Sequence, residues 1–244
     1  MSKLADKIRK VTRTQSQPLG FGSARAAAEP TLVLAARCDD ASSAADLARK
    51  GADVVIVGSA RAPATPSAAA SVKDAIAGAW VPGKAAGEAK AYADAGFDFV
   101  VFDPDRTAAI ALLEEDAGYV MVLPPDLGDA ETRALESFHL DAIDIGAMDG
   151  PLTVRKQIDL RRLFAMVRKP LMTTVKGDIA PAELQALRDT NVVVVVAEDA
   201  GAVERLRKTI DALPARRRHR ESEERPTPLV PRTVGLDEEE GDDE

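Results

Sequence analysis

Eight short apolar runs recur along the chain, and each is followed by an alanine-rich stretch whose apolar residues have helical spacing. Runs that are apolar throughout, such as the valines after Asn191, are typical of a parallel sheet covered by helices. Eight strand–helix units are the number that closes an α/β barrel of the (β/α)8 type, which is the fold we predict. The strands are expected at Thr31–Cys38, Asp53–Ser59, Ala79–Lys84, Phe97–Asp103, Gly118–Pro124, Asp141–Asp149, Pro170–Lys176 and Asn191–Glu198.

An open doubly wound sheet uses the same βα units and is the alternative architecture. The count of eight units favours the closed barrel, as does the absence of a Gly-x-Gly-x-x-Gly sequence after any of the strands. Crossover connections between parallel strands place the helices on the outside. Helices are expected over 42–50, 68–77, 87–95, 105–117, 129–138, 153–167, 181–189 and 200–212.

The periodic pattern divides the chain into three parts. Residues 1–30 are expected to hold an amphipathic N-terminal helix, with Leu4 and Ile8 on its apolar face, and a lead-in to the first strand. Residues 31–213 form the barrel. Residues 214–244 combine six arginines with ten acidic residues and spaced prolines, which is typical of a disordered tail. Apolar residues within this tail leave open whether it docks on the barrel or on a neighbour. The N-terminal helix is expected to plug the barrel or to form a contact in a homo-oligomer.

The charge balance argues against some classes of partner. The net charge is −8, whereas a protein that binds phosphate backbones normally carries an excess of basic residues. No apolar run reaches the roughly 18 residues of a membrane helix, and the start of the chain lacks the apolar segment of a secretory signal. We therefore expect a cytoplasmic protein with neither nucleic acid nor a membrane as its partner.

In barrels of this kind the reactive groups lie where the strands run into the loops that follow them. The candidate residues at these positions, three for catalysis and then three for substrate binding, are Lys176, Asp144 and Lys84, and Arg37, Ser59 and Asp103. Positive charges gathered there favour a small anionic or carbonyl substrate.

Lys176 ends the seventh predicted strand, and alternation places it on the inner face with Met172 and Thr174. Three interpretations of this lysine stay open. It pairs with Asp144 of the neighbouring strand, it binds an anion, or it forms a Schiff base with a carbonyl substrate. A proline and a glycine before Lys84 aim that side chain over the barrel mouth, and a solvated loop lysine is the alternative there.

Other chemistries find less support. Neither histidine lies at the end of a predicted strand, so a serine triad or a cysteine–histidine pair is not expected, and Cys38 is interpreted as a small buried filler. Asp103, Asp149 and Glu198 offer oxygen atoms to a cation such as Mg²⁺. Acidic residues at these positions are more often helix caps, so no metal site is predicted and the cofactor is left unknown.

The stretch Met172-Thr-Thr-Val-Lys-Gly-Asp-Ile and the later Val192–Glu198 resemble the last two units of aldolase-type TIM barrels. Many members of that superfamily cradle a phosphate in glycine-rich loops after strands seven and eight. Lys176 and Gly177 match the strand end of some lysine-dependent aldolases. The chain departs from the pattern in having one glycine where phosphate binders have a pair. Glu198 and Asp199 would also repel a phosphate at the start of the last predicted helix.

Three functions from different classes remain open. The first is a lyase, aldolase or isomerase acting on a small carboxylate or carbonyl metabolite, with Lys176 and Lys84 holding the carbonyl and Asp144 as proton carrier. The second is a non-catalytic barrel that serves as an assembly or scaffold subunit, which the charged tail and the missing phosphate loops would suit. The third is a flavin-binding barrel, against which the missing glycine pairs count.

Overall fold

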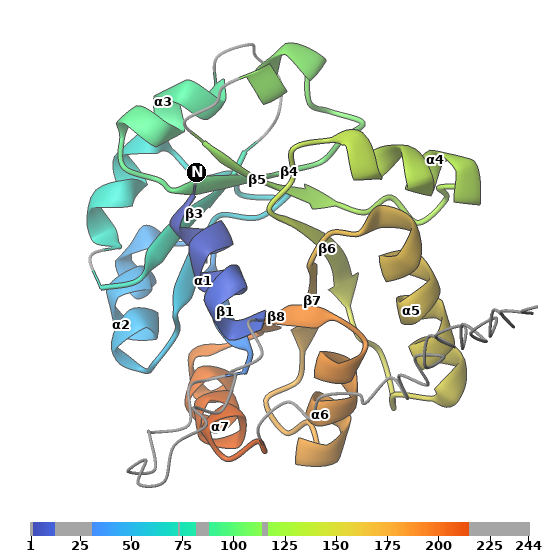
Figure 1. Cartoon of the computed structure of the whole chain (residues 1–244). Helices are drawn as coiled ribbons and strands as arrows, with labels where there is room; N and C mark the ends of the chain where they lie inside the picture. The colour runs from blue at the N-terminus through green and yellow to red at the C-terminus, as the bar shows by residue number, and fades with distance from the viewer. Residues whose placement is uncertain (1, 13–30, 73, 82–87, 114–116, 215–244) are drawn as a thin grey trace, which may run out of the picture.

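The computed structural model describes residues 2–12, 31–72, 74–81, 88–113 and 117–214. Its eight parallel strands follow one another around a closed ring, and β1 pairs with β8 (Figure 1). The predicted barrel is confirmed, and the open sheet is excluded because the ring has no edge strand. The strands are β1 (Val33–Cys38), β2 (Val54–Val57), β3 (Ile76–Trp80), β4 (Phe99–Phe102), β5 (Gly118–Val122), β6 (Ala142–Ala147), β7 (Leu171–Val175) and β8 (Val192–Ala197).

Helices surround the ring, and several begin and end within a residue or two of the expected positions. The α-helices are α1 (Lys3–Thr12), α2 (Ala44–Arg49), α3 (Glu88–Asp94), α4 (Asp129–Ala134), α5 (Val154–Val167), α6 (Pro181–Asp189) and α7 (Ala200–Asp211). The short 3₁₀ segments are η1 (Ala41–Ser43), η2 (Pro66–Ser71), η3 (Ala109–Leu113) and η4 (Leu135–Ser137).

Two of the predicted helices were wrong in type. The segment expected as a helix over 105–117 contains η3 in its described part, and the Tyr119 hydroxyl donates to the Ala111 carbonyl at 2.8 Å, an acceptor that a continuing α-helix would use itself. The segment expected as a helix over 68–77 is η2 followed by the start of β3. That strand begins at Ile76, earlier than predicted, because its first residues pair with β2.

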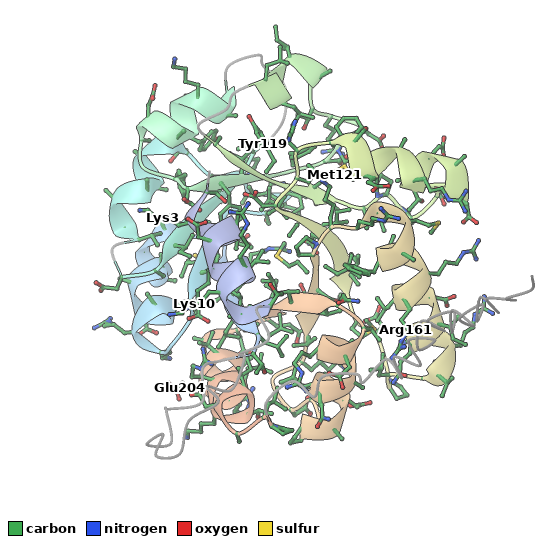
Figure 2. The ribbon with its side chains drawn as sticks, viewed as in Figure 1. Lys3, Lys10, Tyr119, Met121, Arg161 and Glu204 are labelled. Atoms are coloured by element: carbon green, nitrogen blue, oxygen red, sulfur yellow. The ribbon has the colours of Figure 1, made fainter. Side chains whose placement is uncertain are left out.

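Alternate positions along the strands fill the barrel interior. Phe99 is 1 % exposed and belongs to the inner cluster, whereas Tyr119 and Met121, labelled in Figure 2, belong to the outer cluster beneath the helices. A Cβ atom on Gly78 would lie 2.2 Å from the Phe99 ring. The glycine therefore provides the space that this ring occupies inside the barrel.

Helix α1 closes the N-terminal end of the barrel and lies across the ring in Figure 1. Its buried residues Leu4 and Ile8 join the inner cluster, so the predicted apolar face of this helix packs against the strand interiors. Lys3 and Lys10, labelled in Figure 2, mark the two ends of the helix.

Three aspartates, each directly before a strand, fix α1 in place. Asp98 accepts hydrogen bonds from the N–H groups of the first two helical residues at 2.8 and 2.9 Å, which satisfies two donors that an isolated helix leaves open. Asp141 accepts from the Ser2 hydroxyl, and Asp53 pairs with Lys7 at 2.8 Å. Carboxylates at a helix N-terminus also interact favourably with its dipole.

The lead-in over 13–30 and nearly all of the predicted tail lie outside the described residues. Among the helices that the structure does describe, none is long and apolar enough to cross a membrane.

Candidate functional site

A cavity of about 680 Å³ opens at the C-terminal end of the barrel, which we call the mouth cavity. Its walls come from β1, β7 and β8, from Trp80 at the end of β3, and from the loop after β2. The polar and aromatic residues that line it are Arg37, Asp39, Ser59, Arg61, Trp80, Thr174 and Glu198.

The guanidinium of Arg37 is held from two sides. Nη2 donates to Asp144 Oδ2 at 2.9 Å, and Cζ lies 5.2 Å from the centre of the Trp80 ring. Nε is buried and has no hydrogen-bond acceptor among the described residues. The Arg37 side chain is 27 % exposed, whereas that of Asp144 is 3 % exposed. A planar, fixed cation therefore faces the cavity, and its orientation is set before any ligand arrives.

An irregularity in β6 sets the orientation of Asp144. The pairing with β7 skips a residue between Asp144 and Ala147, and Gly146 adopts φ +76°, a backbone conformation that favours glycine. The Gly146 N–H donates to Asp144 Oδ1 at 2.9 Å, and the Thr173 hydroxyl donates to the Gly146 carbonyl at 2.8 Å. Both carboxylate oxygens of Asp144 are thus engaged, one by the bulge and one by Arg37. Bulges of this kind often aim side chains beside functional sites.

The loop after β2 brings a hydroxyl and a second cation to the mouth cavity. Gly58 has φ +87°, and a Cβ atom there would lie 2.5 Å from the backbone nitrogen of Ala64. Ser59 and Ala62 then close a tight turn, with the Ser59 N–H donating to the Ala62 carbonyl at 2.9 Å. Arg61 in this turn is exposed and lines the cavity.

Cys38 is the thiol at this cavity, and its surroundings keep it protonated. Burial, together with the nearby carboxylates of Asp40 and Asp39, raises its pKa from 9.0 to about 11. A thiolate is the nucleophilic form of cysteine, so this thiol is unreactive near neutral pH. Its packing against the outer core is consistent with the prediction of a filler residue.

The structure brings some of the predicted residues together and separates others. Arg37 and Ser59 line the mouth cavity. Asp144 does not line it but contacts Arg37, with which it pairs in place of Lys176. Lys176 is exposed beside a different cavity and has no ion pair among the described residues. Asp103 accepts from the Asp105 N–H at 3.0 Å in a turn outside the mouth cavity. Lys84 lies outside the described residues.

The loops after β7 and β8 do not form an open anion cradle. Asp199 caps α7, because its Oδ1 accepts from the Ala202 N–H at 2.6 Å. A Cβ atom on Gly177 would lie 2.7 Å from Ala202 and from the Arg205 side chain, so the loop after β7 packs closely on the start of α7. The N–H groups of this helix start thus have a carboxylate of their own chain beside them, as expected for a cap. Across the described residues, no group of three or more metal-ligating side chains comes together.

Trp80 and Thr174 line the mouth cavity but were not among the predicted site residues. Trp80 was not predicted because the third strand was expected to begin at Ala79, which placed Trp80 at the start of that strand and not at its end. The correct strand, Ile76–Trp80, would have marked this residue as the last on its strand. Thr174 shares the inner face that alternation assigned to it, so the signal was present without a chemical reason to select it.

Eight parallel strands in a closed ring, each followed by an α-helix or a 3₁₀ segment, and a polar cavity at the C-terminal end define the protein as a TIM barrel. No protein-family model matches the chain, and no curated protein sequence matches it significantly.

Among solved structures, the barrel is similar to 3-keto-L-gulonate-6-phosphate decarboxylase from Vibrio cholerae, with 15 % identity, a TM-score of 0.59, and coverage of 74 % of this chain and 97 % of that chain. It is also similar to KGPDC from Streptococcus mutans, with 16 % identity, a TM-score of 0.58, and coverage of 73 % and 97 %. Phosphoribosyl anthranilate isomerase from Thermus thermophilus matches with 14 % identity, a TM-score of 0.53, and coverage of 73 % and 98 %. Similarity at this identity establishes the fold and leaves the activity to the site itself.

Proposed function

We propose that the mouth cavity binds a small carboxylate metabolite and that the chain acts on it as a lyase or isomerase. The observation that carries this proposal is the fixed guanidinium of Arg37, which Asp144 and Trp80 hold at the wall of the cavity. A planar guanidinium matches the two oxygens of a carboxylate, and less ligand-binding energy is lost to ordering when the cation is already oriented. The similarity in fold to a decarboxylase and an isomerase supports the reaction classes by analogy alone.

The charges around the cavity favour a carboxylate over a phosphate. Asp39 and Glu198 line the same cavity as the two arginines and oppose a dianionic group. The start of α7, where a phosphate would gain from backbone N–H groups, has Asp199 as its cap. A carboxylate ligand bound to Arg37 carries a single negative charge and experiences less of this repulsion.

Each residue of the cavity has a role in this proposal. Arg37 binds the carboxylate, and Asp144 is a positioning residue that acts through Arg37, since both of its oxygens already accept hydrogen bonds. The hydroxyls of Ser59 and Thr174 bind a neighbouring oxygen of the ligand. Glu198 is the carboxylate at the cavity that moves a proton, a role for which it is better placed than the buried Asp144.

The proposal is tested by titrating the purified protein with a panel of 2-oxo and 2-hydroxy carboxylates and with ribose 5-phosphate, using calorimetry. We expect at least one carboxylate to bind, and the variant Arg37→Met to weaken this binding by about tenfold to a hundredfold through loss of a charge-assisted hydrogen-bond pair. Arg106→Met, which changes an exposed arginine at the Asp103 turn, is the matched control and should bind as the wild type does.

Proton-exchange and product signals of the bound carboxylate, followed by ¹H NMR, test the enzymatic part. Glu198→Gln is expected to lower turnover while it leaves binding in place. Binding of ribose 5-phosphate in preference to every carboxylate would overturn the ligand class. If a carboxylate binds through Arg37 but is never converted, the proposed enzymatic activity is overturned and the chain is a binding protein.

A further inference from the structure

A second cavity, of about 290 Å³, lies outside the mouth cavity and shares none of its lining residues. It is bounded by the end of β7, by the segments that lead into α5 and α6, and by α6 itself, and these two helices are neighbours around the ring (Figure 1). We call it the lateral cavity. Its volume is near the lower end of the roughly 300–1,000 Å³ of small-molecule sites, so a ligand of few atoms would fill it.

The floor of the lateral cavity is apolar and reaches the layer between the barrel wall and α6. Val175 and Leu187 are 1 % and 0 % exposed and both line it, with Met148, Leu152 and Ile179 completing the apolar surface. An aliphatic group placed there would be removed from water on every side. Burial of such a side chain in an apolar pocket that is already formed favours binding.

Charged groups of both signs line the same cavity. Lys176 and Asp178 are exposed and neither has an ion-pair partner within the described part of the chain. Glu183 is half-buried, and its Oε1 accepts from the Leu152 N–H at 3.1 Å, which fixes the rim between the two helices. The cavity thus combines an apolar floor with one free cation and one free carboxylate.

We propose that the lateral cavity binds a free α-amino acid with an aliphatic side chain. The side chain occupies the apolar floor, the α-carboxylate pairs with Lys176, and the α-ammonium pairs with Asp178. Ligands with one charge fit less well. A fatty acid would face the carboxylates of Asp178 and Glu183, and an alkylamine would face Lys176. A zwitterion satisfies both rim charges at once.

The inference is independent of the proposed function, because β7 directs Thr174 to the mouth cavity and the next residue, Val175, to the lateral one. Variants at the two cavities therefore distinguish the two proposals.

The test is calorimetric titration of the full chain with leucine. Three further probes each lack one group: glycine lacks the side chain, 4-methylpentanoate the ammonium, and 3-methylbutylamine the carboxylate. We expect leucine to bind, and each of the three probes to bind at least about tenfold more weakly. Lys176→Gln and Asp178→Asn should each weaken leucine binding by a similar factor. Lys208→Gln, at an exposed lysine on α7, should leave leucine binding unchanged. Ile179→Trp, which fills the floor, should abolish binding.

Arg37→Met is expected to leave leucine binding unchanged. Loss of leucine binding in Arg37→Met together with full binding in Lys176→Gln would place the amino acid in the mouth cavity and overturn the inference. Equal affinity for leucine and 4-methylpentanoate would overturn the proposal that the site requires a zwitterion. Absence of leucine binding at millimolar concentration would overturn the proposal of an amino-acid site. Circular dichroism of each variant confirms that a lost signal is not a lost fold.

Discussion

The two ends of the barrel use charged side chains in opposite ways. At the N-terminal end, the aspartates before β2, β4 and β6 all accept hydrogen bonds or ion pairs from the Ser2–Lys7 segment, and the helix they hold covers the interior. At the C-terminal end, Asp39 and Glu198 line the mouth cavity and have no hydrogen-bond or ion-pair partner among the described residues. Satisfied charges stabilise one end, and unsatisfied ones are available to a ligand at the other.

This contrast separates stability from function along the same strands. The inner faces are filled from α1 through the inner cluster, which includes Phe99 and Val101, and then give way to the mouth cavity. Substitutions at the N-terminal end should therefore change the free energy of unfolding and leave ligand affinity as it is. Substitutions at the mouth should change ligand affinity as well as the free energy of unfolding.

The largest expected effect is on the filled part of the barrel. Phe99→Ala removes a ring that is 1 % exposed and occupies the space left by Gly78. We expect the free energy of unfolding to fall by about 3–5 kcal/mol, the usual loss for a buried phenylalanine truncated to alanine. Urea unfolding followed by far-UV circular dichroism measures the loss.

The matched control is Phe138→Ala, because Phe138 is 44 % exposed and should change stability by no more than about 0.5 kcal/mol. Equal losses in the two variants would mean that the ring of strands has no packed interior, and the contrast between the two ends would be lost.

The architecture could be predicted from the sequence because it rests on local periodicity. Mostly apolar strands recur in every unit, glycines follow several of the helical segments, and α6 was placed at its observed bounds, 181–189. The three aspartates that anchor α1 also carried an unused signal, since Asp53, Asp98 and Asp141 each stand one residue before a strand. Their common role depends on α1 lying across the ring, which no local pattern reveals.

The candidate site was harder to predict because its central pair is not local. Arg37 and Asp144 are 107 positions apart and come from β1 and β6, which are not neighbours in the ring. Sequence reasoning considered Asp144 and Lys176 because β6 and β7 are neighbours. The bulge at Gly146 directs Asp144 Oδ1 to its own backbone, and Lys176 lies at the lateral cavity. Alternation gives the face of a side chain, but such a bulge has no sequence signal beyond one glycine.

A smaller effect on stability is expected from the mouth cavity. Arg37→Met leaves the Asp144 carboxylate, which is 3 % exposed, with the Gly146 N–H as its remaining partner. We expect a loss of about 1–3 kcal/mol, less than for a fully buried ion pair because Arg37 is itself partly exposed. Chemical unfolding of the single variant and of Arg37→Met with Asp144→Leu measures the effect, since the second change removes the unpaired charge.

The double variant should recover most of the lost stability, and Arg106→Met, which breaks an exposed pair with Asp103, should cost less than about 0.5 kcal/mol. If the double variant were as unstable as the single one, the loss would come from the Trp80 contact and not from the stranded carboxylate.

The smallest expected effect is a dependence on pH at the N-terminal end. Burial raises the pKa of Asp141 above its ordinary value of 3.8, and the nearby Asp98 carboxylate adds to this, against the opposing hydrogen bond from Ser2. The folded state then binds the proton more tightly than the unfolded state does. The stability that comes from this difference is fully present below pH 3.8 and is lost as the pH rises through the folded pKa.

Asp141→Asn keeps an oxygen that can accept from Ser2 and carries no charge to desolvate. Relative to the wild type, its free energy of unfolding should therefore rise as the pH increases from below 3.8 through the folded pKa of Asp141, and then level off. Urea midpoints at a series of pH values, with Asp6→Asn at an exposed carboxylate of α1 as the control, measure the difference. Curves for Asp141→Asn and the wild type that stay parallel across this range would contradict a raised pKa, and the ionised carboxylate would then hold α1 at no cost in desolvation.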